Sequence, residues 1–117
     1  MTGNLNYSNL AENGNYANCL FYLDTNGRCA YVNEYCCRYM GYAREEFIAR
    51  TLNELGVLTD FKSFKSMFNL CMHGKTRQFE TIIRRKDGTT FPAEINISQA
   101  SFGHRLLLRC DLYGTEG

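Results

Sequence analysis

The cysteines are the residues of this 117-residue chain most able to do chemistry, and there are six: Cys19, Cys29, Cys36, Cys37, Cys71 and Cys110. Their spacing does not suit zinc, because there is no C-x-x-C pair and two of the cysteines are adjacent. Six cysteines could form a disulfide framework in a secreted protein, but the first residues lack the charged and apolar segments of a signal peptide. We therefore expect six reduced thiols that serve as small buried side chains.

The adjacent pair Cys36 and Cys37 leaves redox sensing open as an alternative. Neighbouring residues of a helix point about 100° apart, so one of these thiols should face the core and the other the flank.

The remaining reactive groups do not indicate catalysis. The histidines, His73 and His104, have no nearby nucleophile and carboxylate in an arrangement typical of covalent catalysis, and both glycine-rich phosphate-binding motifs are missing. With 13 basic and 12 acidic side chains, the net charge is +1. The basic run 84–86 is followed at once by Asp87, which argues against a nucleic-acid surface. We expect no enzyme and no nucleic-acid partner.

The length fits one domain with one core. Hydrophobic residues make up 44% and charged residues 21% of the chain, as in ordinary soluble domains. No apolar run approaches the ~20 residues of a membrane span. These features predict a cytoplasmic location and no membrane contact by this segment.

The first half of the chain predicts a hairpin followed by short helices. Residues 19–25 and 28–32 flank Asn26-Gly27, a pair typical of a type I′ turn with positive φ at both positions. Asn33 should cap a helix that ends at Gly41. A second helix fits residues 44–50, although Ala43 cannot cap it with its side chain.

The second half predicts one helix and three strands. The helix spans about residues 60–73, begins at Asp60 and carries an apolar stripe that includes Phe61, Phe64 and Phe68. Strands at 77–86 and 90–98 flank Asp87-Gly88, and a last strand covers 104–112. Clean alternation from Phe91 onward indicates a sheet with one buried face. The predicted fold is α+β, a five-stranded antiparallel sheet with short helices over one face.

Several segments, in this order and spacing, resemble the PAS domain. They are the opening hairpin at 23–28, the strand-to-helix junction at 31–34, the segment 40–48 with its G-Y-x-x-E-E-hydrophobic pattern, the hairpin at 84–91, and Asp111-Leu112 at the usual end of the domain. Two departures are Ala43-Arg44 in place of Ser-Pro or Thr-Pro, and an ending without a charged exit helix.

The resemblance implies a PAS domain over residues 18–113, after an N-terminal arm at 1–17 that could hold a short helix. Residues 114–117 would be a tail before an output domain in a longer chain. It further implies a sensory module of a bacterial-type signalling protein, such as a sensor histidine kinase or cyclase, that binds a small-molecule ligand or a partner. The alternative is a ligand-free module for dimerisation or docking through the arm and the outer sheet face. An apolar, weakly charged arm favours a homodimer.

No cofactor is expected, because the motifs of the relatives that bind one are missing. The Asn-Cys-Arg-Phe-Leu run of flavin-binding relatives does not occur. Haem-binding relatives carry a histidine near the start of the long helix, where residues 60–64 contain none. Neither flavin nor haem is therefore expected, and no metal.

A sheet capped by short helices can enclose an apolar pocket with a few polar groups. The candidate lining residues are Tyr31, Cys36, Tyr39, Phe47, Phe64, Phe68, Ile82, Ile95 and Leu107. The hydroxyls of Tyr31 and Tyr39 would orient a ligand. The alternative is that the many rings fill this space and no ligand binds.

Overall fold

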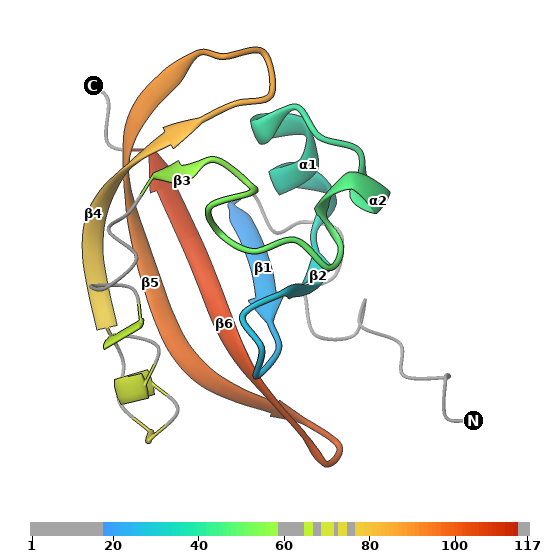
Figure 1. Ribbon diagram of the computed structural model, residues 1–117, viewed down its shortest axis with the longest axis vertical. Coiled ribbons are helices and arrows are strands. Elements are labelled where there is room, and N and C mark those ends of the chain that lie inside the picture. Colours follow the sequence, from blue (N-terminus) through green and yellow to red (C-terminus); the bar gives the residue numbers. More distant parts are fainter. Residues whose placement is uncertain (1–17, 59–64, 67–68, 72, 75–76, 115–117) are drawn as a thin grey trace.

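The computed structural model describes residues 18–58, 65–66, 69–71, 73–74 and 77–114. The elements in chain order are β1 (Cys19–Leu23), β2 (Cys29–Val32), α1 (Glu34–Met40), α2 (Arg44–Phe47), β3 (Val57–Leu58), β4 (Arg77–Arg84), β5 (Thr90–Phe102) and β6 (Arg105–Gly114). The strands form one sheet in the order β2-β1-β6-β5-β4-β3, and both helices lie over one face of it (Figure 1). The predicted α+β fold is confirmed.

All five predicted strands are present, and each paired neighbour is antiparallel. The two-residue strand β3 was not predicted, and it pairs with Ile82 and Ile83 at the edge of the sheet. Two residues are too few to show a period-2 pattern, so this strand had no sequence signal.

The hairpin turns at Asn26-Gly27 and Asp87-Gly88 lie where they were predicted, but the type I′ conformation predicted at Asn26-Gly27 is wrong. Gly27 has φ of 79°, whereas Asn26 is not among the residues with positive φ. The Gly27 N–H donates to the Asp24 carbonyl at 2.9 Å, and the Asp24 carboxylate accepts from the N–H groups of Asn26 and Arg28. This carboxylate holds a wider turn that needs the left-handed conformation at the glycine alone.

Helix α1 begins and ends as predicted. Asn33 caps its first turn by accepting from the Cys36 N–H at 2.9 Å, and Gly41 ends it with φ of 87°. Helix α2 is shorter than predicted, because Ala49 and Arg50 bond to the backbone of Cys29 instead of continuing the helix. Ala49 has φ of 72°, which a helix cannot accommodate.

The long helix predicted over residues 60–73 lies mostly outside the described residues, including Asp60, Phe61, Phe64 and Phe68. The described residues 65–66 and 69–71 have helical backbone.

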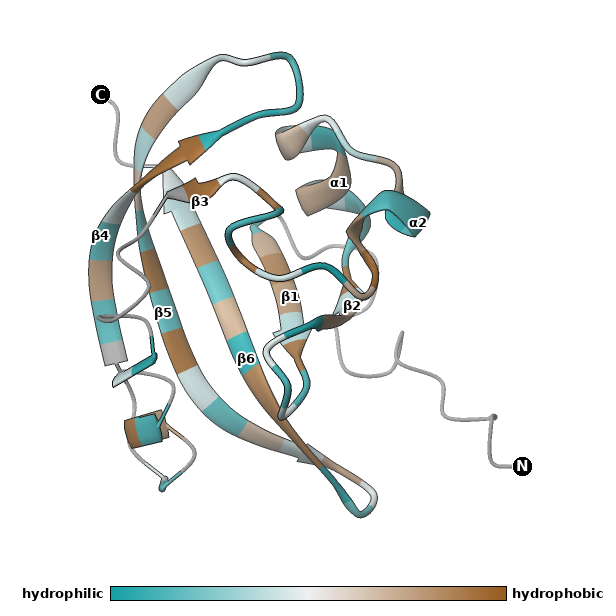
Figure 2. Ribbon diagram, in the orientation of Figure 1, coloured by the Kyte–Doolittle hydropathy of each residue, from teal (hydrophilic) through white to brown (hydrophobic). Residues whose placement is uncertain are grey.

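The sheet has a buried layer on each face. On the helix side, β1, β5 and β6 contribute apolar side chains that pack against α1 and α2, among them Phe21, Phe91, Ile95, Leu108 and Leu112. On the opposite side, Leu20, Tyr22 and Leu107 form a smaller cluster, with Tyr31 and Phe102 at its border. Figure 2 shows the alternation of hydrophobic and hydrophilic residues along β5 and β6 that separates these layers.

Candidate functional site

Four of the nine predicted pocket residues lie together between the helices and the sheet. Cys36, Phe47 and Ile95 belong to the helix-side core, and Tyr39 packs against it. Phe64 and Phe68 lie outside the described residues.

The other three predicted pocket residues are not on this face, and their placement is corrected here. Tyr31 and Leu107 belong to the cluster on the opposite side of the sheet, and Ile82 is 45% exposed. Ile82-Ile83 and the run Leu106–Leu108 are uniformly apolar, so they carry no alternation to show which residue points inward.

Tyr31 was placed on the wrong face because of a β-bulge. Leu23 pairs with Cys29 and Tyr22 pairs with Tyr31, which leaves Ala30 as the extra residue. A bulge of one residue reverses the in-and-out order after it. Tyr31 therefore lies beside Tyr22, with ring centroids 6.0 Å apart.

Aromatic rings occupy much of the space between the helices and the sheet. Phe47 packs on Phe21 and Tyr42 at centroid distances of 6.1 and 5.9 Å, and Tyr39 meets Phe91 at 5.1 Å. Sequence reasoning placed Phe91 on the inner face correctly but missed Phe21 and Tyr42 as partners of Phe47. The described part of the predicted pocket is therefore densely packed.

Hydrogen bonds and an ion pair hold the turn between β4 and β5 against the helices. Arg85 donates from Nε to the Tyr39 carbonyl at 2.8 Å, and its guanidinium carbon lies 4.3 Å from the centroid of Phe91 and 4.9 Å from that of Tyr39. Lys86 donates from its backbone N–H to the Met40 carbonyl at 3.0 Å and from Nζ to Glu46 at 2.6 Å. The helices are thus tied to the hairpin at one end of the sheet.

The thiols form the most unusual feature of the core. All six cysteines are free and buried. Burial raises the pKa of Cys29 to about 12 and raises the pKa values of Cys36 and Cys110 well above the ordinary thiol value. Because a thiolate is the reactive form, these groups are poor nucleophiles in the folded state at neutral pH.

A small hollow opens on the surface where α1 meets the end of β6, with a volume of about 240 Å³. It is lined by Asn18, Tyr35, Tyr39, Leu112, Tyr113 and Gly114. A Cβ atom at Gly114 would lie 2.6 Å from the Tyr39 hydroxyl, so a larger residue there would require the end of the Tyr39 side chain to shift. Of the predicted orienting tyrosines, Tyr39 borders this hollow.

Within the described ranges, no three His, Cys, Asp or Glu side chains gather as metal ligands, and no helix has the length and apolarity to cross a membrane. His73 is exposed, and its Nδ1 lies 2.7 Å from the carbonyl of Asn69. His104 is exposed in the turn between β5 and β6.

An antiparallel sheet in the order β2-β1-β6-β5-β4, with short helices packed over one face, is the architecture of a PAS domain. A family model described as PAS domain matches residues 17–108, and the chain belongs to this family. The predicted resemblance is confirmed. No curated protein matches the chain significantly.

Solved structures share the fold at low sequence identity. The PAS domain of an HTR-like protein from Haloarcula marismortui is 22% identical, with a TM-score of 0.78 over 86% of this chain and 89% of that one. A domain of a sensory box sensor histidine kinase/response regulator from Geobacter sulfurreducens is 20% identical, with a TM-score of 0.71 over 90% and 89%. A light-oxygen-voltage domain studied with a flavin analogue is 17% identical, with a TM-score of 0.69 over 85% and 78%.

Proposed function

We propose that this chain is a sensory or regulatory module of a bacterial-type signal-transduction protein, such as a sensor histidine kinase or cyclase. Membership of the PAS family supports this role, and the solved domain of similar fold from Geobacter sulfurreducens belongs to a sensor histidine kinase. The module would respond to a small ligand or a partner and would itself perform no catalysis.

The arrangement of strands carries the proposal. β1 and β6 pair at the middle of the sheet with Cys19 opposite Leu112, so the chain enters and leaves the domain at the same end (Figure 1). The hollow beside Tyr39 lies at this end, and α1 packs over β1. A ligand that changes the position of α1 would therefore act directly on the strands that lead to neighbouring domains.

Release of a bound small molecule tests ligand binding. The chain is purified under native conditions, and its intact mass is compared by native and denaturing mass spectrometry. A stoichiometric small molecule lost on denaturation would support the ligand-binding form of the proposal, and a Tyr39→Ala variant should lose it. A chain that carries no ligand, and whose melting temperature is unchanged by a metabolite panel, would contradict that form.

We propose that the domain works without flavin or haem. Burial raises the pKa of Cys36 and Cys110, so these core thiols are poorly suited to forming a flavin adduct or a thiolate bond to iron. The purified protein should be colourless, and a flavin or Soret absorption retained through purification would refute this.

A docking role through the outer sheet face is the second candidate, because the half-buried Tyr31 and Phe102 border the buried cluster of Leu20, Tyr22 and Leu107 on the side opposite α1 and α2. We propose that the arm at residues 1–17 packs here, on its own domain or on a second copy, in a homodimer. Deleting residues 1–17 should shift the dimer toward monomer in sedimentation across a concentration series. Full-length protein that stays monomeric at high micromolar concentration would exclude the dimer, and a truncated chain that stays dimeric would exclude the arm's role.

A further inference from the structure

Two of the buried thiols touch each other across the joint between β1 and α1. Cys19 begins β1 and Cys36 lies in the first half of α1, and their side chains are in hydrogen-bond contact. Their exposed fractions are 1% and 0%. Seventeen positions of chain and a complete hairpin separate them, so this contact is made by the fold and not by sequence proximity.

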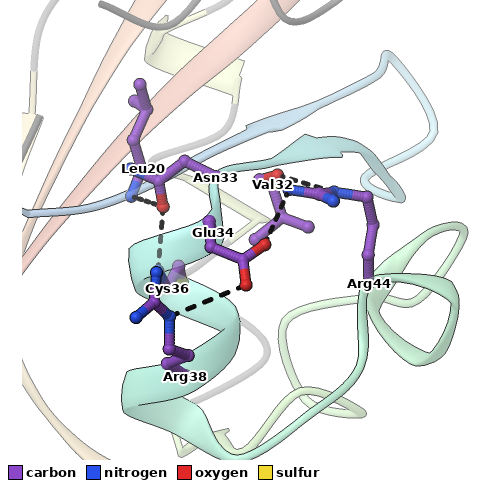
Figure 3. Close-up of polar contacts among 7 residues, drawn as sticks. All are labelled: Leu20, Val32, Asn33, Glu34, Cys36, Arg38 and Arg44. Carbon is purple, nitrogen blue, oxygen red and sulfur yellow. Dashed lines mark hydrogen bonds and ion pairs between the residues drawn. The ribbon is translucent and has the colours of Figure 1, made fainter. Parts of the chain in front are cut away.

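The side chain of Asn33 fixes this contact. Its Oδ1 accepts from the N–H of Cys36 at 2.9 Å and from the N–H of Leu20 at 3.3 Å (Figure 3), while its Nδ2 donates to the Asn18 carbonyl at 2.8 Å. One buried amide therefore binds the residues on both sides of Cys19 and the backbone of Cys36. The backbone segments that carry the two thiols are therefore held together.

The surface hollow lies next to this pair. Its lining includes Asn18, which precedes Cys19, Tyr35, which precedes Cys36, and Leu112, which pairs with Cys19 across β1 and β6. A volume of about 240 Å³ holds several molecules the size of water, each of about 30 Å³. The hollow thus reaches the residues that precede both thiols, while the thiols themselves are buried beneath it, so oxidation requires a local opening of the joint.

We propose that Cys19 and Cys36 are a modification site, at which a peroxide converts the thiol pair to a disulfide that locks α1 to β1. One thiolate attacks a peroxide oxygen, the O–O bond breaks, and with one proton taken up a sulfenic acid and water form. The second thiol then attacks the sulfenic sulfur and releases a second water. Two thiols and one hydrogen peroxide thus give one disulfide and two waters, with each sulfur losing one electron.

The bond would act at the end of the domain where both chain ends leave. Cys19 is opposite Leu112 of β6, so the disulfide would fix α1 against the β1–β6 pair. The burial that raises the pKa of Cys36 keeps the reaction slow at neutral pH and makes it faster as the pH rises. Sustained exposure to peroxide, and not a brief pulse, would therefore be needed to form the disulfide between Cys19 and Cys36.

Peptide mapping tests the proposal. The folded full chain is treated with hydrogen peroxide, free thiols are blocked, and the denatured protein is digested with trypsin and an endoprotease that cleaves after glutamate. These cuts place Cys19 in peptide 13–28, Cys29 in 29–34, and Cys36 with Cys37 in 35–38. We expect peptides 13–28 and 35–38 to be joined, and the count of free thiols to fall from six to four.

Two variants complete the test. Cys37→Ala should retain the bond between peptides 13–28 and 35–38, whereas Cys36→Ala should lose it and keep its five thiols reduced. If Cys36→Ala does not fold, the wild-type and Cys37→Ala maps still decide the question. A bond between Cys36 and Cys37, a bond that involves Cys29, or six thiols that survive treatment would each overturn the proposal. None of these outcomes bears on whether the domain binds a ligand.

Discussion

Replacing Asn33 with alanine should be the most damaging polar substitution at the joint between β1 and α1. The exchange removes a helix cap, which costs about 1 kcal/mol. It also leaves the N–H of Leu20 and the carbonyl of Asn18 without the bonds that Asn33 makes to them. An unsatisfied buried group costs about 1–3 kcal/mol, and this applies to the Leu20 N–H, whereas the half-buried Asn18 can bond to water. The loss is therefore at least about 2 kcal/mol, a large fraction of the usual ~5–15 kcal/mol of a domain.

Urea unfolding measured by far-UV circular dichroism checks this value. With a slope of about 1–3 kcal/mol per molar urea, the midpoint should fall by at least about 0.7 M. Asn33→Ser is the matched control, because serine keeps the bond to the Cys36 N–H but cannot reach Asn18; it should recover about 1 kcal/mol. A loss below about 0.5 kcal/mol in the alanine variant would refute the view that Asn33 carries this joint.

Three further predictions concern other parts of the fold. Gly56 has φ of 85°, and a Cβ atom there would lie 2.1 Å from the Arg84 carbonyl oxygen. Gly56→Ala should therefore lower the unfolding free energy by about 3 kcal/mol or more. The control is Gly27→Ala, where a Cβ atom would meet nothing within 4 Å, and it should lower the unfolding free energy by only about 1 kcal/mol. Equal losses of unfolding free energy in the two variants would contradict the predicted clash at Gly56. Arg85→Lys removes the hydrogen bond to the Tyr39 carbonyl and the stacking on the Tyr39 ring, and should lower the unfolding free energy by about 1–2 kcal/mol in thermal or urea unfolding. A change near zero would show that these Arg85 contacts do not stabilise the fold. Because the pKa of Cys29 is raised from 9.0 to about 12, its stabilising effect is full below pH 9 and is lost as the pH rises to 12. Wild type should therefore lose about 1 kcal/mol more of its unfolding free energy than Cys29→Ala between pH 8 and pH 10. Equal losses in the two proteins would refute the raised pKa of Cys29.

Local signals in the sequence predicted much of this fold. Asn33 and Gly41 are specific cap residues with a physical reason to stand at helix ends, and both ends of α1 were predicted correctly. The clean alternation from Phe91 gave the right inner face for β5. The end of α2 was missed, because it depends on backbone bonds from Ala49 and Arg50 to Cys29, a residue distant in sequence.

The candidate site was harder to predict, for two physical reasons. Where apolar residues run together, as at Ile82-Ile83, the period-2 signal that separates the two faces is missing. At Tyr31 an unpredicted bulge at Ala30 reversed the faces. The contact between Cys19 and Cys36 could not be predicted either, because it depends on how α1 packs on β1. Whether Cys36, Tyr39, Phe47 and Ile95 contact a ligand remains a prediction.

The pairing of β1 with β6 also determines when the molecule can fold during its synthesis. β1 leaves the ribosome among the first residues of the domain, but its partner β6 is among the last. Until β6 emerges, β1 has only β2 as a neighbour in the sheet, and its other edge remains unpaired. Pairing between such distant segments is slow because a long loop must close first. The nascent chain therefore exposes most of its thiols to solvent or to chaperones before the core closes over them.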